Sequence, residues 1–160
     1  MDQFFTRRAL LATATASAAI AATPLASASG NFEVTRTEAE WKAMLTPLQY
    51  KVMRREGTER PFSSPLDKNY ADGTYHCRGC DLAVYASDHK FDSGTGWPSF
   101  YQAIDKGAVG TSTDYKIGYP RTEVHCADCG GHLGHIFGDG PAPTGKSHCI
   151  NGLAMDFIPA

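Results

Sequence analysis

Four of the five cysteines in this 160-residue sequence occur in two pairs, Cys77-x-x-Cys80 and Cys126-x-x-Cys129. A two-residue gap lets both sulfurs of one turn point at the same ion, and two such turns complete the tetrahedral sulfur site that Zn²⁺ favours. We therefore expect one structural zinc ion, bound between two hairpins that are far apart in the sequence. Because four thiolates leave no open coordination position, this zinc is not expected to take part in catalysis.

Two other interpretations of these pairs stay open from the residues alone. In an oxidising compartment, the four cysteines can instead form two disulfides. A redox-active pair of the thioredoxin type is less favoured, because neither pair opens a helix within a β-α-β pattern. Stoichiometric zinc in the purified protein distinguishes the first interpretation from the other two.

Cys149 is the cysteine that remains when the two pairs are assigned. It lies in a predicted strand, where side chains alternate between faces, so Ser147, Cys149 and Asn151 share one face. Taken alone, such a cysteine is more often a small buried apolar residue than a nucleophile. Its assignment to catalysis therefore depends on what the rest of the chain brings next to it.

The glycine-rich segment 131–139 carries His132, His135 and Asp139. Histidine is the usual proton donor near neutral pH, and flanking glycines allow a small ligand to approach closely. We expect the two histidines to supply acid catalysis. Two alternatives remain: histidines with a structural role, or a second metal site in which Asp139 is the third ligand.

Trp97 lies between glycine and proline in the segment 94–100, Gly-Thr-Gly-Trp-Pro-Ser-Phe. Aromatic faces suit methyl and sulfur groups, so this residue is a candidate wall for an apolar or sulfur-bearing ligand. A core aromatic in a tight loop is the alternative interpretation.

Two helices are predicted ahead of these residues, and the first begins after Thr37. Thr37 and Glu40 form a capping box, in which each side chain satisfies a free backbone N–H of the other residue. Trp41, Met44 and Leu45 follow at helical spacing, so we expect all three to face the core.

The second predicted helix begins at Thr46, has Pro47 at its first position and contains another capping box completed by Gln49. It should end near Gly57. Residues 58–69 contain two prolines and no clear period, and we expect an extended arm over the surface.

From residue 74 onward, short apolar runs alternate with Gly, Pro and Asp, which indicates antiparallel sheets. The predicted strands are 74–77, 83–85, 111–117, 121–125 and 148–157.

The first 28 residues are expected to be an export signal and not part of the fold. Residues 6–11, Thr-Arg-Arg-Ala-Leu-Leu, resemble a twin-arginine signal, and the Ala/Thr-rich stretch 9–22 is short for a membrane span. Residues 26–28, Ala-Ser-Ala, form a cleavage site, so we expect cleavage after Ala28 and a periplasmic domain over 29–160. An uncleaved N-terminal anchor is the alternative.

The net charge of the chain is −2 with histidine neutral. Binding to nucleic acid needs clustered positive charge, and the sequence contains no block of Lys and Arg. We therefore expect no nucleic-acid partner. We also expect no stable membrane insertion of the mature chain, and a monomer.

Together these segments resemble the R-type peptide methionine sulfoxide reductases, in their zinc-bearing branch. The resemblance runs from about Trp41 to Phe157. The motifs that carry it are 45–50 (LTPLQY), 57–62 (GTERPF), 73–75 (GTY), 90–100 (KFDSGTGWPSF), 131–137 (GHLGHIF) and 149–151 (CIN).

The resemblance implies two antiparallel sheets with short N-terminal helices. It also implies reduction of the R epimer of methionine sulfoxide in proteins or peptides. The Cys149 thiolate would attack the sulfoxide sulfur, and His135, assisted by His132, would protonate the leaving oxygen. This sequence of steps would leave Cys149 as a sulfenic acid.

The same resemblance implies roles for four further residues. Trp97 and Phe137 are expected to bind the substrate, with Trp97 against its methyl group. Asp139 is expected to orient a histidine, and Asn151 to position a catalytic group or a water.

Two positions depart from the family pattern. An arginine commonly lies two residues before the catalytic cysteine, where this chain has Ser147, so the thiol should be less acidic. Some relatives carry a resolving cysteine where this chain has Thr95. With four cysteines on zinc, Cys149 has no internal partner, and we expect recycling by an external thioredoxin-like thiol donor.

Overall fold

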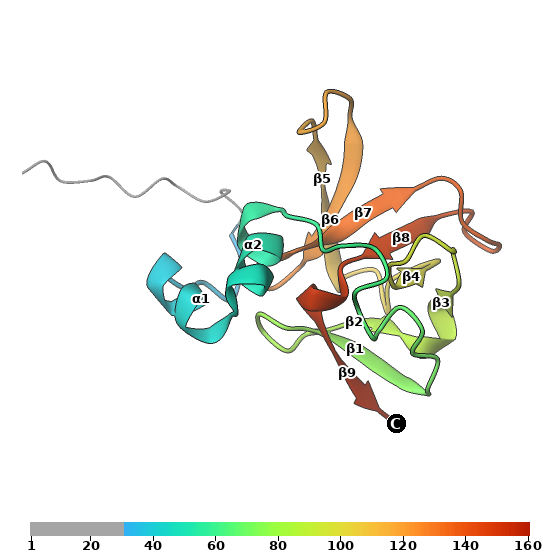
Figure 1. Ribbon diagram of the computed structural model, residues 1–160, viewed down its shortest axis with the longest axis horizontal. Helices are drawn as coiled ribbons and strands as arrows, with labels where there is room; N and C mark the ends of the chain where they lie inside the picture. The colour runs from blue at the N-terminus through green and yellow to red at the C-terminus, as the bar shows by residue number, and fades with distance from the viewer. Residues whose placement is uncertain (1–30) are drawn as a thin grey trace, which may run out of the picture.

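The computed structural model describes residues 31–160, so the predicted export signal at 1–28 lies outside the described residues. Figure 1 shows two short helices beside a mainly β body. Within the described part, no helix is long and apolar enough to cross a bilayer. The elements are α1 (Glu38–Met44), α2 (Pro47–Arg55), β1 (Gly73–Cys77), β2 (Ala83–Ala86), η1 (Ser87–His89), β3 (Lys90–Phe91), β4 (Ser99–Phe100), β5 (Val109–Asp114), β6 (Arg121–Cys126), β7 (His132–Phe137), β8 (Ser147–Ile150), η2 (Gly152–Ala154) and β9 (Met155–Pro159).

The strands form two antiparallel sheets, which confirms the predicted fold class. One sheet has three strands in the order β2-β1-β9, and the other has six in the order β3-β4-β8-β7-β6-β5. Most strand neighbours are joined by short turns, but β8 is inserted between β4 and β7. This insertion brings three distant segments of the chain together around the middle of the larger sheet.

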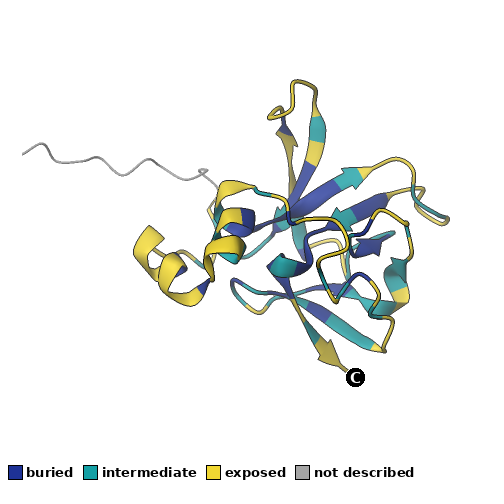
Figure 2. Ribbon diagram, in the orientation of Figure 1, coloured by how far each residue is buried: buried dark blue, intermediate teal, exposed yellow. Residues whose placement is uncertain are grey.

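Aromatic side chains join the two sheets. The rings of Tyr85 on β2 and Phe100 on β4 stack with their centroids 4.4 Å apart, and Tyr75 on β1 meets Phe100 edge-on at 4.9 Å. All three residues have no exposed surface. Figure 2 shows the buried residues concentrated along the strands, whereas the tip of the β5–β6 hairpin is exposed. The core therefore lies between the sheets and fixes their relative position.

Both capping boxes are confirmed. Thr37 accepts from the backbone N–H of Glu40 at 3.3 Å while Glu40 accepts from the N–H of Thr37 at 2.7 Å, and α2 begins with the equivalent pair. Trp41 and Leu45 are buried as predicted, but the expectation for Met44 is wrong, because this side chain is 45% exposed. The helix is only seven residues long, and it meets the core along the edge that carries residues 41 and 45.

The end of α2 differs slightly from the prediction. Glu56, and not a glycine, adopts the left-handed conformation that closes the helix, with φ 48°. Gly57 is needed for another reason: a Cβ there would lie 2.8 Å from the carbonyl oxygen of Lys51, which accepts the N–H of Gly57. The predicted stop is thus near the right place, but it operates by close approach of two backbone segments.

The single strand predicted over 148–157 is wrong. Strand β8 ends at Ile150, a 3-10 turn follows, and β9 joins the other sheet. The backbone N–H groups of Gly152 and Leu153 donate to the carboxylate of Glu59, so they are not available to a neighbouring strand. This long-range contact interrupts an otherwise apolar run.

Two further strand predictions need correction. Strand β7 was not predicted, because its glycine and its two histidines are poor strand formers. The strand predicted over 111–117 ends at Asp114, since the carboxylate of Asp114 accepts the N–H of Lys116 at 2.7 Å and starts a turn.

Candidate active site and metal centre

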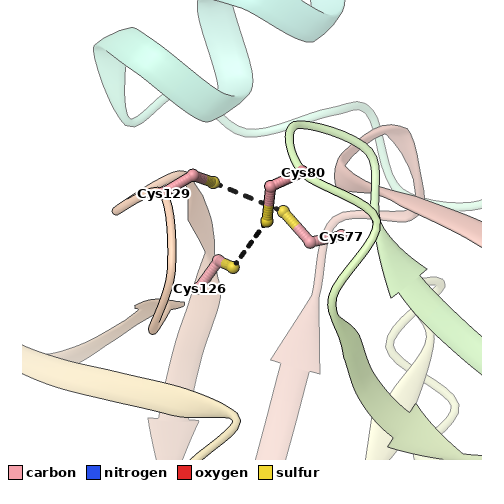
Figure 3. Close-up of side chains that lie close together, drawn as sticks. All are labelled: Cys77, Cys80, Cys126 and Cys129. Carbon is pink, nitrogen blue, oxygen red and sulfur yellow. Dashed lines mark hydrogen bonds between the residues drawn. The ribbon is translucent and has the colours of Figure 1, made fainter. Parts of the chain in front are cut away.

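The four paired cysteines converge at one point between the two sheets (Figure 3). Cys77 ends β1 and Cys126 ends β6, and each is followed by a turn that returns its partner cysteine. The sulfurs of Cys77 and Cys129 are 3.6 Å apart, those of Cys80 and Cys126 are 3.4 Å apart, and all four lie within 4.8 Å of one another.

This geometry fits a tetrahedral metal ion. Zinc–sulfur bonds of about 2.3 Å place the sulfurs of a tetrahedron about 3.8 Å apart, close to the separations observed. A disulfide needs sulfurs about 2 Å apart, and all five cysteines are free. The donor set and its spacing therefore favour the metal interpretation over two disulfides.

The cysteine group also connects the helices to the sheets. The guanidinium of Arg54 on α2 donates to the carbonyl oxygen of Cys129 at 3.0 Å. A Cβ added to Gly79 would lie 3.2 Å from the sulfur of Cys129 and 3.2 Å from each of the Met53 and Trp41 side chains. Three of the four cysteines are thus buried in the core, and Cys80 is partly buried at its edge.

Cys149 lies far from that group in the fold, in the middle of the six-stranded sheet. Strand β8 pairs with β4 on one side and β7 on the other, so Cys149 is directly opposite Ser99 and directly opposite His135. Side chains of directly opposite residues in an antiparallel pair have Cβ atoms about 5 Å apart. The strand register therefore places the candidate nucleophile and the candidate acid side by side.

Two hollows meet at Cys149. An open cleft of about 610 Å³ is lined by Cys149, Ser147, Trp97, Phe137 and Asp139, among others. A smaller hollow of about 130 Å³ is lined by Cys149 together with His135, Asn151, Trp97 and Phe137, among others. The predicted alternation holds, because Ser147 and Cys149 face the cleft, whereas the ring of His148 bonds the hydroxyl of the core residue Tyr85 at 3.1 Å.

Burial raises the pKa of the Cys149 thiol, and the charges of Asp139 and Glu59 raise it further. The hydroxyl of Thr95, 4.0 Å from the sulfur, acts in the opposite direction. Among the described residues that line the cleft, Asp92 and Asp139 are acidic and none is lysine or arginine. The larger cleft thus offers Cys149 no cation, whereas Arg121 lines the smaller hollow beside it.

Each candidate histidine is held by a buried carboxylate. The ring of His135 donates from Nε2 to Asp114 at 2.8 Å, and the ring of His132 donates from Nδ1 to Glu123 at 2.8 Å. A carboxylate can only accept, so these bonds fix which ring nitrogen carries hydrogen. The two rings contact each other edge-on with centroids 5.3 Å apart.

Among the described residues, no hydrogen bond joins Asp139 to His132 or His135. Its side chain is exposed and lines the cleft near Cys149, while Asp114 and Glu123 orient the histidines. The structure also does not support a second metal site at His132, His135 and Asp139. Over residues 31–160, the cysteines form the one group of three or more ligand side chains close enough to hold an ion.

His132 and His135 differ in their relation to Cys149. His135 lines a hollow with Cys149, whereas His132 lines a separate hollow of about 370 Å³ together with Glu123 and His125. Burial lowers the pKa of His135, and the positive charge of Arg121 adds to this effect, against the opposing hydrogen bond with Asp114. Burial and Arg121 thus favour the neutral form of the His135 imidazole.

Asn151 and Trp97 are connected through a residue that the sequence analysis did not identify. The amide of Asn151 donates to the carbonyl oxygen of Leu133 at 3.0 Å and accepts from the N–H of Glu59 at 2.9 Å. The indole N–H of Trp97 donates to the carbonyl oxygen of Glu59 at 3.2 Å. Residues 58–69 therefore do not merely cross the surface, since their beginning is part of the site.

The chain is similar to known proteins over most of its length. The sequence profile of the SelR domain matches residues 45–159. The chain is 48% identical over 127 residues to a peptide methionine sulfoxide reductase MsrB of Leptospira interrogans, covering 79% of this chain and 97% of the relative. It is 49% identical over 127 residues to the protein of that name from Agrobacterium fabrum, covering 79% and 94%. It is 52% identical over 124 residues to that of Methanosarcina barkeri, covering 78% and 87%.

The profile covers the described chain from the second helix to the last strand, and these relatives cover 78% to 79% of the full chain. The chain therefore belongs to the SelR-domain family, the family of the peptide methionine sulfoxide reductases MsrB.

Proposed function

We propose that this protein is a peptide methionine (R)-S-oxide reductase that uses Cys149 as its nucleophile. The observation that carries the proposal is the register of β7 and β8, which sets Cys149 directly opposite His135 beside a hollow walled by Trp97. Reduction of a sulfoxide needs a nucleophile at sulfur and an acid at oxygen, both facing one substrate atom pair. The names of the relatives supply the substrate class.

The atoms balance without an added proton. The thiol of Cys149 gives its proton to Nδ1 of neutral His135, whose Nε2–H stays bonded to Asp114. The thiolate sulfur attacks the sulfoxide sulfur, and the imidazolium returns the proton to the sulfoxide oxygen. This attack forms a bond between the two sulfurs, and the protonated oxygen then passes as hydroxide from the substrate sulfur to the sulfur of Cys149. The substrate sulfur–oxygen bond and the sulfur–sulfur bond break, a sulfur–oxygen bond forms on Cys149, and methionine leaves while Cys149 is a sulfenic acid. The substrate sulfur gains two electrons and the cysteine sulfur loses them.

Trp97 and Phe137 line both hollows at Cys149, which suits a side chain that ends in a methyl group on sulfur. Both residues are therefore assigned to substrate binding. Asn151, which is 3% exposed, lines the hollow that contains His135 and can position the sulfoxide oxygen or a water there. His132 acts on the reaction through the ring of His135, which it contacts.

Recycling of Cys149 is assigned to an external dithiol of the thioredoxin type. Thr95 occupies the place nearest the sulfur, at 4.0 Å, and the other four cysteines are gathered at the metal centre. A thiolate of the donor attacks the sulfenic acid and releases water, and its second thiol then frees Cys149 while a disulfide forms on the donor. The cleft of about 610 Å³ gives that donor access.

The remaining assignments follow the sequence. One Zn²⁺ held by Cys77, Cys80, Cys126 and Cys129 stabilises the fold. The segment 1–28 directs export of the folded, metal-loaded chain to the periplasm, where 29–160 acts as a monomer on oxidised proteins. A cleavage near Ala28 is checked by mass spectrometry of the protein recovered from the periplasm.

The proposal is tested by supplying both epimers of a methionine sulfoxide peptide with dithiothreitol as reductant. We expect turnover of the R epimer, little turnover of the S epimer, and one zinc per chain. After a single turnover without reductant, mass spectrometry should find one added oxygen on Cys149. Failure to reduce either epimer would leave a zinc-bearing binding module as the better interpretation, which the serine at position 147 favours.

A further inference from the structure

Glu59 is a buried carboxylate at the start of the arm 58–69. Glu59 is 7% exposed. Among the described residues, its carboxylate accepts from backbone N–H groups and forms no salt bridge with a cation. One oxygen accepts from Gly152 at 2.6 Å, and the other accepts from Leu153 at 2.9 Å. Burying a charge in this way is costly, and such groups are rare unless their contacts are specific.

The backbone of the same residue contacts two candidate site residues. Its N–H donates to the side-chain oxygen of Asn151, and its carbonyl oxygen accepts the indole N–H of Trp97. Trp97 precedes β4 and Asn151 follows β8, so the two flank neighbouring strands of the sheet that are far apart in the sequence. The carboxylate of Glu59 fixes the position of the backbone that links them.

The arm 58–69 packs closely against both segments that carry these residues. A Cβ on Gly152 would lie 1.9 Å from the hydroxyl of Ser64, so the turn after Cys149 closely contacts the arm. On the other side, the N–H of Phe62 donates to the carbonyl oxygen of Gly96 at 2.7 Å, next to Trp97. The arm is therefore tied both to the loop that carries Trp97 and to the turn that carries Asn151.

We propose that Glu59 is a positioning residue that sets the orientation of Trp97 and Asn151 relative to Cys149, and thereby sets the selectivity of the enzyme for one sulfoxide epimer. This inference rests on the proposed function. The two epimers differ in whether the methyl group or the oxygen occupies a given position around sulfur. An enzyme distinguishes them only if its methyl-binding wall and its oxygen-binding groups are held in fixed relation to the nucleophile.

The carboxylate is suited to this task in a way that an amide is not. Both of its oxygens accept, and both bonds go to consecutive N–H groups of one turn. In Glu59→Gln, one of these N–H groups would face an NH₂ group and lose its acceptor. The turn would then shift, and a displacement of about 1 Å at a reacting site can cost about 100-fold in rate.

The test compares Glu59→Gln with the matched control Asp67→Asn, measured with dithiothreitol on each epimer separately. Asp67 is also a buried carboxylate of the arm, but no hydrogen bond joins it to Trp97 or Asn151. We expect Glu59→Gln to lower kcat/KM for the R epimer about 10- to 100-fold. Its effect on the S epimer should be smaller, so the ratio of the two falls. Asp67→Asn should keep the wild-type ratio, and Glu59→Asp should recover part of it.

A second variant addresses the case in which Glu59→Gln does not fold. Trp97→Phe keeps an aromatic wall but removes the indole N–H that bonds Glu59, so it should lower the epimer ratio in the same way. Where both variants fold, their effects on the ratio should not add, because they break the same link. A folded Glu59→Gln, or a Trp97→Phe, with the wild-type epimer ratio overturns the inference. Absence of turnover by the wild-type protein instead overturns the proposed function.

Discussion

The metal centre and the Cys149 site both depend on cysteine sulfur, but the fold builds them in opposite ways. Each half of the metal centre is a single turn at the end of a strand, and the two turns, one from each sheet, bring their sulfurs together. The Cys149 site draws on β6, β7, β8 and the turn after it, the loop before β4 and the arm 58–69, with one to three residues from each. The first site is local and dense, and the second is distributed and half-open.

This difference determines how each site should respond to change. Four sulfurs that share one ion fail together, because loss of one ligand affects the binding of all. The residues around Cys149 act through separate hydrogen bonds, so their loss should be graded.

Removing the metal should unfold the protein. Zinc bound by four cysteines contributes about 10 to 16 kcal/mol in small metal-dependent domains, which equals or exceeds the whole stability of an ordinary domain. We expect both a strong chelator and Cys126→Ser to abolish the cooperative thermal transition seen by circular dichroism. A metal-free chain that keeps its transition would show that the sulfur group is not what holds the two sheets together.

Replacing the sulfur of Cys149 should abolish activity but leave the metal content and the stability unchanged. In Cys149→Ser, we expect at least about 10³-fold loss of activity, as for removal of a nucleophile from other enzymes, with zinc content and Tm close to wild type. Metal analysis and calorimetry on the same sample separate the two effects. Retained reductase activity would contradict the assignment of Cys149, and lost zinc would contradict the independence of the two sites.

The contrast also explains what sequence reasoning could and could not reach. Features determined by neighbours in the chain were predictable: the paired cysteines and the capping boxes at Thr37 and Thr46. The partners of His132 and His135 were not, because Glu123 and Asp114 come from neighbouring strands and are recognisable only once the register is known.

The errors have the same origin. The run 148–157 is apolar enough for one strand, and only the distant carboxylate of Glu59 interrupts it. Asp139 was chosen to orient a histidine because it is close to one in sequence, whereas in the fold it lies on the cleft. Strand β7, with two glycine-flanked histidines, is held by its neighbours on both sides and not by its own composition.

Removing the charge of the Asp114 carboxylate should lower kcat by an intermediate amount. It holds His135 in the tautomer that leaves Nδ1 free, so in Asp114→Asn the imidazole can turn or change tautomer. We expect kcat to fall about 10²-fold, within the range ascribed to one proton-transfer group. Zinc content should not change. A rate near wild type would mean that the thiol proton does not pass through His135.

Ser147→Arg should raise activity, whereas the preceding variants lower it. Burial raises the pKa of Cys149, so the thiolate fraction falls as pH decreases below that pKa, and the reaction should slow on the acid side of neutrality. An arginine in the cleft lowers the thiol pKa by favouring the charged form. We expect kcat/KM at mildly acidic pH to rise about three- to tenfold and the pH profile to move to lower pH. An unchanged profile would show that serine at this position is not what limits the thiol.

Asp139→Asn should also move the pH profile of kcat/KM to lower pH, by the smallest amount of these variants. The charge of Asp139 raises the pKa of Cys149 across the cleft, so its removal should move the pH profile of kcat/KM slightly to lower pH, with a gain of about twofold below neutrality. Asp92→Asn is the matched control, because this second carboxylate of the cleft is paired with Lys68 at 2.9 Å and already has its charge offset. Loss of activity in Asp139→Asn would instead assign Asp139 to the machinery that orients the acid. Equal shifts in the two variants would mean that the thiol senses the total charge of the cleft and not the unpaired carboxylate nearest to it.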